Sequence, residues 1–271
     1  VLGSAPHKPN VQNVAIENST NETFLEKMSA VDVIYLDPSR RDDTGKKVVR
    51  IEDCSPDVSE IQDLLLAKAK MVLIKFSPML DISLAIKNLK KVSEVHVISV
   101  ENECKELLFL LYSEKEYTSY ITVNLNKNND IEKFYFTFEE EQNAEISFAT
   151  TIEKYLYEPN TSILKAGAFK SVARQFNIKK LHVNSHLYTS DNLISDFPGR
   201  TFAVKDWFVP NKKNLNSFVS ETKKANISVR NFPLSVAEIR KKTGLREGGD
   251  VYLFATTLSN KKKICVVGEK V

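Results

Sequence analysis

An acid, a proline and two arginines follow directly on an apolar run near the start of the chain. Val31–Leu36 is rich in β-formers and apolar on both faces, which predicts a buried parallel strand, and it ends in Asp37-Pro38-Ser39-Arg40-Arg41. Ligands of open α/β sheets bind at the carboxyl ends of strands. Because proline keeps the preceding residue extended and lacks an N–H, Asp37 is expected to point into a cleft rather than enter a helix.

The chemistry open to this motif is recognition of a polar or phosphorylated substrate. Arg40 and Arg41 have the fork geometry that clamps phosphate in a bidentate manner. Lys75 ends the next expected strand, so it faces the same edge and is a second phosphate ligand. The alternative is purely structural: Asp37 and Pro38 end a strand, the arginines form surface ion pairs, and Lys75 extends its stem along apolar surface.

The segments around this motif alternate between strand and helix. Strands are predicted at Val14–Ile16, Val31–Leu36, Met71–Phe76, Val95–Val100 and Leu107–Tyr112, and helices at Asn21–Met28, Ile61–Ala69 and Ser83–Val92. Such alternation between residues 31 and 100 indicates a parallel α/β sheet.

The pattern changes after residue 113. Tyr120–Leu125 and Lys133–Phe138 alternate around a polar turn and predict a hairpin, and Glu139–Glu141 indicates a solvated loop. An amphipathic helix at Ser162–Phe176 follows, and then a strand leading into a turn at Leu181–Tyr188.

A third unit is expected from residue 201. Its predicted elements are Thr201–Phe208 (strand), Leu215–Ala225 (helix), Ile227–Phe232 (strand), Ser235–Thr243 (helix), and Val251–Thr257 and Lys263–Val267 (strands). Ser235 and Glu238 form a capping box, and Gly244 supplies the residue after the helix. We therefore expect three units, at residues 1–150, 151–200 and 201–271.

Composition excludes several classes of protein. The chain has only eight glycines and no Gly-x-Gly, which excludes a complete dinucleotide fingerprint or P-loop within it. No apolar run has the length of a membrane span, and the start lacks a signal-peptide core, so a cytoplasmic protein is expected. Three distant cysteines without a Cys-x-x-Cys pair indicate buried thiols. His182 and His186 are four apart in a strand-like stretch, so no metal site is expected.

Charge is distributed unevenly along the chain. Residues 200–271 contain 15 Lys and Arg against six Asp and Glu, whereas the first 199 residues contain 23 against 29. A basic terminal module is a usual layout for nucleic-acid binding, although a solvated lysine-rich surface has the same composition. The phosphate candidates are Arg240, Lys241, Lys242, Arg246, Lys261, Lys262 and Lys263. A weaker group, Lys205, Lys212 and Lys213, adjoins Trp207-Phe208, which is either a base-stacking surface or core.

Four segments together resemble one protein family. Val31–Asp42 resembles the fourth motif of class I S-adenosylmethionine (SAM)-dependent methyltransferases, and its Ser-Arg-Arg form is similar to bacterial methyltransferases with a THUMP-like C-terminal domain. The other three segments are Tyr155–Asn160 running into Lys165–Phe169, Leu181–Thr189, and Val229–Ser235 with Gly248–Phe254.

The resemblance implies the C-terminal part of a Rossmann-like methyltransferase sheet, followed by small α+β modules that are ferredoxin-like (residues 151–200) and THUMP-like (residues 201–271). Val14–Ile16 would be the third strand of that sheet, Val31–Leu36 the fourth and Met71–Phe76 the fifth. Asn18 or Ser19 would then lie near the adenine of SAM, with Asp37 beside the cofactor. The first strand and its glycine-rich turn are expected upstream, so we interpret the chain as a fragment.

The function implied is SAM-dependent methyl transfer, with RNA as the substrate. Related enzymes carry Asp-Pro-Pro-aromatic, where the Asp accepts a hydrogen bond from an amino group and the aromatic ring stacks on a flipped base. Here Ser39 and Arg40 replace the second proline and the aromatic residue, so phosphate binding or arginine stacking is as compatible as amine methylation. The alternative is a non-catalytic RNA-binding or adaptor protein that retains a partial sheet.

Overall fold

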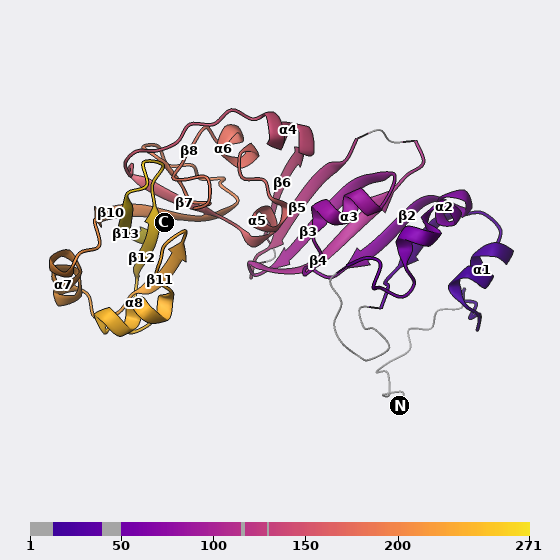
Figure 1. The fold of residues 1–271 in the computed structure, drawn as a ribbon, viewed down its shortest axis with the longest axis horizontal. Coiled ribbons are helices and arrows are strands. Elements are labelled where there is room, and N and C mark those ends of the chain that lie inside the picture. Colours follow the sequence, from indigo (N-terminus) through magenta and orange to yellow (C-terminus); the bar gives the residue numbers. More distant parts are fainter. Residues whose placement is uncertain (1–12, 40–49, 115–116, 129) are drawn as a thin grey trace.

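The computed structural model describes residues 13–39, 50–114, 117–128 and 130–271. Its strands form two sheets that lie side by side along the molecule (Figure 1). The first has the order β1-β2-β4-β3-β5-β6, and the second has the order β11-β12-β13-β10-β7-β9-β8. The chain is therefore a mixed α/β protein, as predicted.

The first sheet has one edge where four strands end. Its strands are β1 (Val31–Leu36), β2 (Ala69–Phe76), β3 (Val92–Val100), β4 (Glu103–Leu111), β5 (Ser119–Leu125) and β6 (Ile131–Thr137). β1 is parallel to β2 and β3 is parallel to β5, while β4 lies antiparallel between β2 and β3. β1, β2, β3 and β5 consequently point the same way. The predicted hairpin after residue 119 is confirmed by the antiparallel pairing of β5 with β6.

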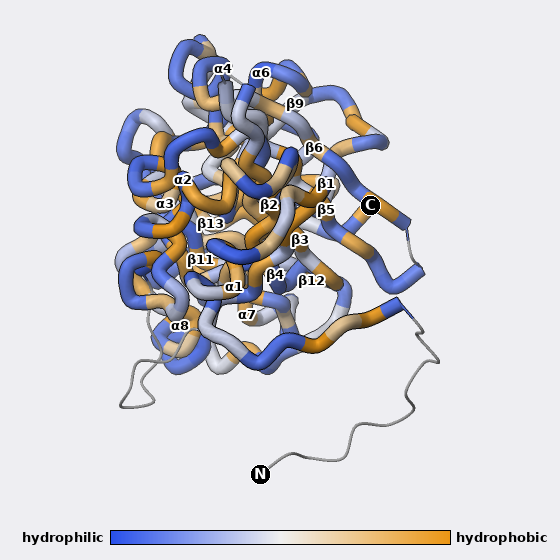
Figure 2. The backbone as a smooth tube through the Cα atoms, turned by 90° about the vertical axis from the view of Figure 1, so that its right-hand side faces the viewer, coloured by the Kyte–Doolittle hydropathy of each residue, from blue (hydrophilic) through white to orange (hydrophobic). Residues whose placement is uncertain are grey.

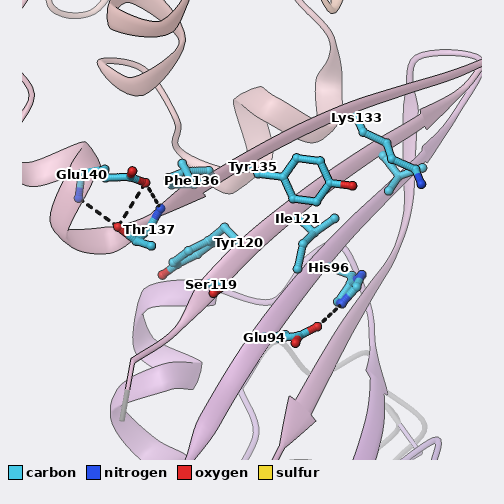
Figure 3. A pocket seen from close by; sticks show the side chains of 11 residues that line it. Glu94, His96, Ser119, Tyr120, Ile121, Lys133, Tyr135, Phe136, Thr137 and Glu140 are labelled. Atoms are coloured by element: carbon cyan, nitrogen blue, oxygen red, sulfur yellow. Dashed lines mark hydrogen bonds and ion pairs between the residues drawn. The ribbon is translucent and has the colours of Figure 1, made fainter. Parts of the chain in front are cut away.

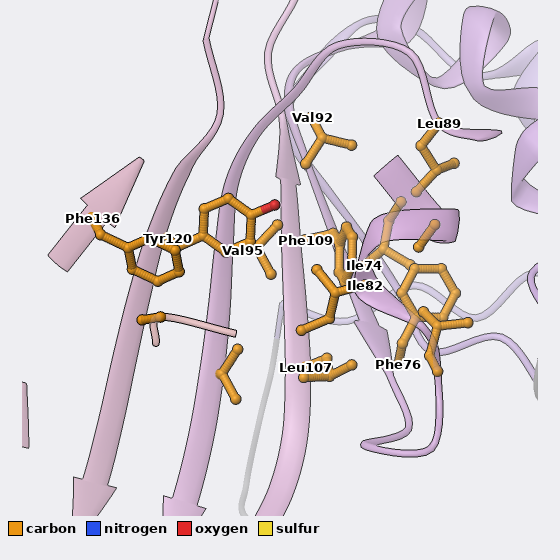
Figure 4. Close-up of a cluster of buried hydrophobic side chains, with 14 of the residues drawn as sticks. Ile74, Phe76, Ile82, Leu89, Val92, Val95, Leu107, Phe109, Tyr120 and Phe136 are labelled. Carbon is orange, nitrogen blue, oxygen red and sulfur yellow. The ribbon is translucent and has the colours of Figure 1, made fainter. Parts of the chain in front are cut away.

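The helices of the described chain cover one face of the first sheet and leave the other face uncovered. The first three helices are α1 (Asn21–Lys27), α2 (Val58–Lys68) and α3 (Ile82–Asn88), and their apolar residues join the sheet in one core. Ile74 and Phe109 are fully buried in that core (Figure 4). On the opposite face, Val33, Tyr35 and Tyr135 remain exposed. The prediction that β1 is buried on both faces is therefore wrong, because no described helix packs on its second face.

The strand predicted at Val14–Ile16 is also wrong. The segment is extended but unpaired, and both Val14 and Ile16 are exposed. A strand needs a hydrogen-bonded neighbour, and none of the described strands pairs with this segment.

The acidic run at Glu139–Glu141 is helical and structural rather than a solvated loop. It lies in α4 (Phe138–Asn143), which begins with a capping box between Thr137 and Glu140. The Glu141 carboxylate accepts backbone N–H groups of Phe169, Lys170 and Ser171 at 2.8–3.1 Å. This acid therefore ties the end of the first sheet to the segment that follows it.

The single helix predicted at Ser162–Phe176 is two short helices, α5 (Thr161–Ala166) and α6 (Ser171–Gln175). Gly167 has φ +80° and ends α5, a left-handed conformation that interrupts an α-helix. The strand predicted at Leu181–Tyr188 is mostly a tight turn, because Ser185 N–H donates to His182 O and Leu181 N–H donates to Leu187 O. Only β8 (Lys179–Lys180) and β9 (Tyr188–Ser190) flank it.

The second sheet contains the C-terminal residues and part of the middle segment. Its other strands are β7 (Tyr155–Pro159), β10 (Gly199–Phe208), β11 (Asn226–Arg230), β12 (Val251–Thr257) and β13 (Lys263–Lys270), with helices α7 (Lys212–Glu221) and α8 (Val236–Thr243). The predicted capping box of Ser235 and Glu238 and the left-handed Gly244 are confirmed. Apolar strand residues cluster centrally, with hydrophilic loops outside (Figure 2).

Residues 155–166 contact both sheets. β7 pairs with β10 in the second sheet, and α5 follows immediately and packs on β3 and β5 of the first. Tyr157 and Ile163 are fully buried in the core of the first sheet, whereas Leu156 is fully buried in the second core. The two sheets are thus joined by packing as well as by the chain.

Gly199 is predicted to be indispensable for this joint. A Cβ at this position would lie 2.3 Å from the backbone oxygen of Glu158. Gly199→Ala is therefore expected to lower the free energy of unfolding by at least about 2 kcal/mol, measured by urea denaturation.

The matched control is Gly244→Ala. Gly244 has φ +70° but nothing within 4 Å of an added Cβ, so only backbone strain of about 1 kcal/mol is expected. An equal loss in the two variants would contradict the close approach at Gly199.

Candidate functional site

Asp37 and Lys75 lie together at the carboxyl edge of the first sheet. The register pairs Leu36 with Ile74, so the next residues of the two parallel strands are neighbours. Lys75 Nζ is 2.6 Å from Asp37 Oδ2, and the two side chains are 29% and 52% exposed. This hydrogen bond to Asp37 raises the pKa of Lys75 above its ordinary value, so the ammonium stays protonated at neutral pH. The structure thus brings together two residues that the sequence placed at one edge.

The chain after Asp37 is held by backbone pairing. Pro38 is buried, and Ser39 exchanges two hydrogen bonds with Ser55, of 2.8 and 3.1 Å. Asp37 is therefore anchored between β1 and a fixed residue, which limits where its carboxylate can move. Among the residues that the structure describes, none donates a hydrogen bond to Asp37 Oδ1.

The structure brings none of the other described residues assigned to this site into a hydrogen bond or ion pair with Asp37 or Lys75. Arg40 and Arg41 lie outside the described residues. Asn18 and Ser19 are exposed just before α1, and no described contact links them to Asp37. Their role beside a cofactor stays a prediction.

The basic candidates of the C-terminal unit fall into two groups. β12 and β13 pair from Val251↔Glu269 to Thr257↔Lys263, so Lys261, Lys262 and Lys263 lie at one end of the hairpin. Lys212 and Lys213 begin α7 near that same end, because Phe208 pairs with Cys265. Lys241, Lys242 and Arg246 lie at the other end, where Arg246 bridges to Lys224. The sequence signal missed Lys223 and Lys224, which are exposed beside Arg246.

Three of these cations are engaged within the protein. Arg240 donates to the carbonyl oxygens of Leu245 (3.0 Å) and Ala225 (3.3 Å) and so closes the end of α8. Lys205 pairs with Glu269 at 2.9 Å. Lys262 Nζ lies 4.8 Å from the centre of the Trp207 ring, which packs partly buried against the second core.

The histidines have structural surroundings. His182 Nδ1 lies 3.0 Å from the Asn231 amide nitrogen, and the His186 ring stacks on Phe169 with centres 3.7 Å apart. Burial, with the neighbouring Lys180 and Arg230 charges, lowers the pKa of His186 to about 4, so it is neutral at pH 7. Among the described residues, no group of three acidic, His or Cys side chains could hold a metal ion.

A charged cluster that the sequence reading did not single out lies at the joint of the sheets. Glu158 is 3% exposed, and its carboxylate accepts from Arg200 Nε at 2.9 Å and from Arg230 Nη2 at 2.8 Å. One sequence signal could have predicted this cluster: Glu158 lies within the apolar run Tyr155-Leu-Tyr-Glu-Pro. An acid in such a run is expected to be buried, and buried carboxylates are seldom left without a cationic partner.

A shallow pocket of about 590 Å³ lies on the uncovered face of the first sheet, away from Asp37. Figure 3 shows Tyr135 and Ile121 along its strands and the Glu94–His96 pair, 3.0 Å apart, beside them. Its lining comes from β3, β5, β6 and α4, so it is a feature of the open face and not of the carboxyl edge.

The described helices include none with the length and apolar character that a membrane crossing requires.

Comparison with protein families divides the second half of the chain. Residues 155–198 match a ferredoxin-like domain, and residues 199–270 match a THUMP domain-like family. A search of curated proteins found no match.

One solved structure extends the likeness to nearly the whole chain. A candidate methyltransferase from Porphyromonas gingivalis W83 is similar at 38% sequence identity, with a TM-score of 0.82. The match covers 89% of this chain and 60% of that one, so the chain spans three fifths of the similar protein. The chain thus combines a sheet like that of a candidate methyltransferase with ferredoxin-like and THUMP-like segments.

Proposed function

We propose that the chain is the C-terminal part of a SAM-dependent methyltransferase that acts on RNA. The observation that carries this proposal is the Asp37–Lys75 pair at the carboxyl edge of a sheet whose first two strands are parallel and whose next two form a reversed hairpin. Ligands bind at this edge in open α/β sheets. The likeness to a candidate methyltransferase supports the reaction class, and the basic THUMP-like segment supports an RNA substrate.

The residues present fit part of a SAM site. Asp37, with Asn18 and Ser19, supplies polar side chains for one side of the cofactor, but the sequence contains no Gly-x-Gly turn for the other. The exposed Val33 and Tyr35 on β1 are consistent with further elements covering that face in a longer protein. SAM would supply an electrophilic methyl group on a sulfonium.

The task of this chain's residues is to position the nucleophile. Asp37 Oδ1, which has no donor among the described residues, accepts a hydrogen bond from an N–H or O–H of the substrate, which turns the lone pair of that atom toward the methyl carbon. Lys75 holds the other oxygen at 2.6 Å, fixes the carboxylate and stays protonated beside the negatively charged RNA backbone. The proton displaced from the nucleophile leaves to solvent through this half-exposed edge.

We also propose that three segments of the chain have different roles. Residues 1–150 carry the catalytic edge, residues 151–200 connect it to the rest, and residues 201–271 bind RNA through their two basic ends. Phosphate contacts of this kind give salt-dependent binding with little sequence preference.

The affinity of the chain for SAM is predicted to be low. Because the glycine turn is missing from the sequence, the 271-residue chain is expected to bind SAM more weakly than about 1 mM. Isothermal titration of the chain and of an upstream-extended protein measures this, and the extended protein is expected to bind. Tight binding of SAM by the chain would contradict the proposal that it holds only part of the SAM site. No binding by either protein would contradict the proposal of a SAM-dependent enzyme.

The Asp37 side chain is predicted to be needed for methyl transfer but not for RNA binding. In an upstream-extended protein, Asp37→Ala is expected to lower methyl transfer to RNA at least about 100-fold, since the nucleophile loses its acceptor. RNA affinity is expected to change less than about twofold, as for an ordinary surface substitution. Transfer of labelled methyl groups and filter binding measure the two effects.

Asp32→Ala is the matched control. Asp32 pairs with Lys70 at 2.7 Å across the same two strands, but at the opposite edge of the sheet. It is expected to leave methyl transfer unchanged. Equal losses in the two variants would assign the Asp37 effect to folding rather than to chemistry.

A further inference from the structure

A polar cleft of about 640 Å³ opens where the two sheets meet. On the first sheet it is lined by residues that follow or end β3 and β5, including Asn102 and Asn126, and on the second by Arg200 of β10 and Lys270 of β13. Since β1, β2, β3 and β5 run in the same direction, this cleft lies on the same edge as Asp37. Four strand spacings separate β1 from β5, a distance of about 19 Å across the sheet.

The charged residues that line the cleft sum to a net charge of +1. Lys127, Arg200 and Lys270 line it together with two acids, Glu101 at the rim and Glu132. The Glu132 carboxylate accepts amide N–H groups from three asparagines at 2.8–3.1 Å, namely Asn124, Asn126 and Asn160. No ion pair in the described chain involves Lys127 or Lys270. An anion entering the cleft therefore meets two lysines that form no ion pair in the described chain, with Glu101 and Glu132 in the same lining.

Arg200 is held in place before any ligand arrives. Its guanidinium is fixed by the buried Glu158, which Arg230 also holds, and it lies over the Phe202 ring at 5.6 Å. The Arg200 side chain is still 37% exposed, and a guanidinium carries five N–H donors, so donors remain for a phosphate. Ordering this side chain on binding consequently costs little entropy.

Asparagine amides add donors and acceptors that suit base edges. Asn102 has φ +62°, and its Oδ1 accepts the Thr161 N–H at 2.8 Å while its own N–H donates to Asn124. Its Nδ2 has no described partner, and Asn128 is exposed at the tip of the β5–β6 hairpin. Unstacked bases of single-stranded RNA are read through such groups on their Watson–Crick and Hoogsteen edges.

We propose that this cleft binds a single-stranded segment of the RNA substrate. Lys127, Arg200 and Lys270 contact its phosphates, the asparagine amides contact a base, and the strand continues along the carboxyl edge to Asp37. The proposal rests on the proposed RNA substrate, but it assigns a binding site at the joint of the two sheets, formed by residues other than the basic candidates of the C-terminal unit.

The test is the affinity of the 271-residue chain for a fluorescein-labelled 12-nucleotide single-stranded RNA, measured by anisotropy over a salt series. K127E/K270E is expected to weaken binding about tenfold or more and to flatten the log–log salt slope by about 1.4, the loss of two contacts at about 0.7 each. Both side chains are exposed, so the fold is expected to survive.

The matched control is K91E/K154E, which makes the same change in net charge. Lys91 precedes β3 at the opposite edge, and Lys154 precedes β7 at the end of that strand remote from Gly199. Both side chains are exposed. This variant is expected to bind RNA within about twofold of the wild type.

The outcomes separate the two proposals. If both double variants weaken binding equally, or neither does, while the wild-type chain binds RNA, the cleft assignment is overturned and the RNA substrate stands. Absence of binding by the wild-type chain overturns the cleft and the RNA substrate together. Competition by uridine monophosphate at concentrations equal to the RNA would show a pocket for a free nucleotide and overturn the strand path.

Discussion

The architecture depends on the antiparallel pairing of β7 with β10 at Gly199. This pairing is possible because a backbone without a side chain lies against the carbonyl of Glu158. One residue past β7, Asn160 caps α5 by accepting the Ile163 N–H, and α5 then packs on the first sheet. A few residues therefore fix the second sheet relative to the first. The matched ferredoxin-like and THUMP-like segments consequently contribute strands to one sheet and are not separate domains joined by a linker.

This joint has consequences for how a long substrate could be held. The basic ends of the β12–β13 hairpin, the cleft at the joint and the Asp37–Lys75 pair are all attached to elements that share packed cores. Binding at a distance can orient a reacting group only if the connection is stiff, because free rotation would lose the entropic advantage of a tethered substrate. Tyr157 of β7 and Ile163 of α5 are buried in the same core, so this packing holds the second sheet against the first.

Sequence patterns predicted the parts that depend on local chemistry. The β1 and β2 strands, the β5–β6 hairpin and the α8 caps follow from alternation, turns and a capping box, all of which act within a few residues. The predictions that proved wrong concern residues whose environment is set by parts of the chain far away in sequence. The acidic Glu139–Glu141 run is predicted to be solvated because its local sequence is polar. Glu141 instead accepts backbone hydrogen bonds near residue 170, some 30 residues away, and no local pattern shows this. For the site, the sequence placed Asp37 and Lys75 at one edge, but nothing local revealed that Glu158 holds two arginines.

The surroundings of three carboxylates indicate which of them is suited to chemistry. Glu158 is buried with both oxygens bound by guanidinium groups, and both Glu132 oxygens accept amide N–H groups. A carboxylate with both oxygens bound positions its donors and has little capacity left for a substrate. Asp37 differs because it is half exposed and one oxygen is bound by Lys75, while the other lacks a donor in the described chain. A carboxylate thus holds the structure together at the joint, whereas at the carboxyl edge a half-exposed carboxylate keeps one oxygen without a donor among the described residues.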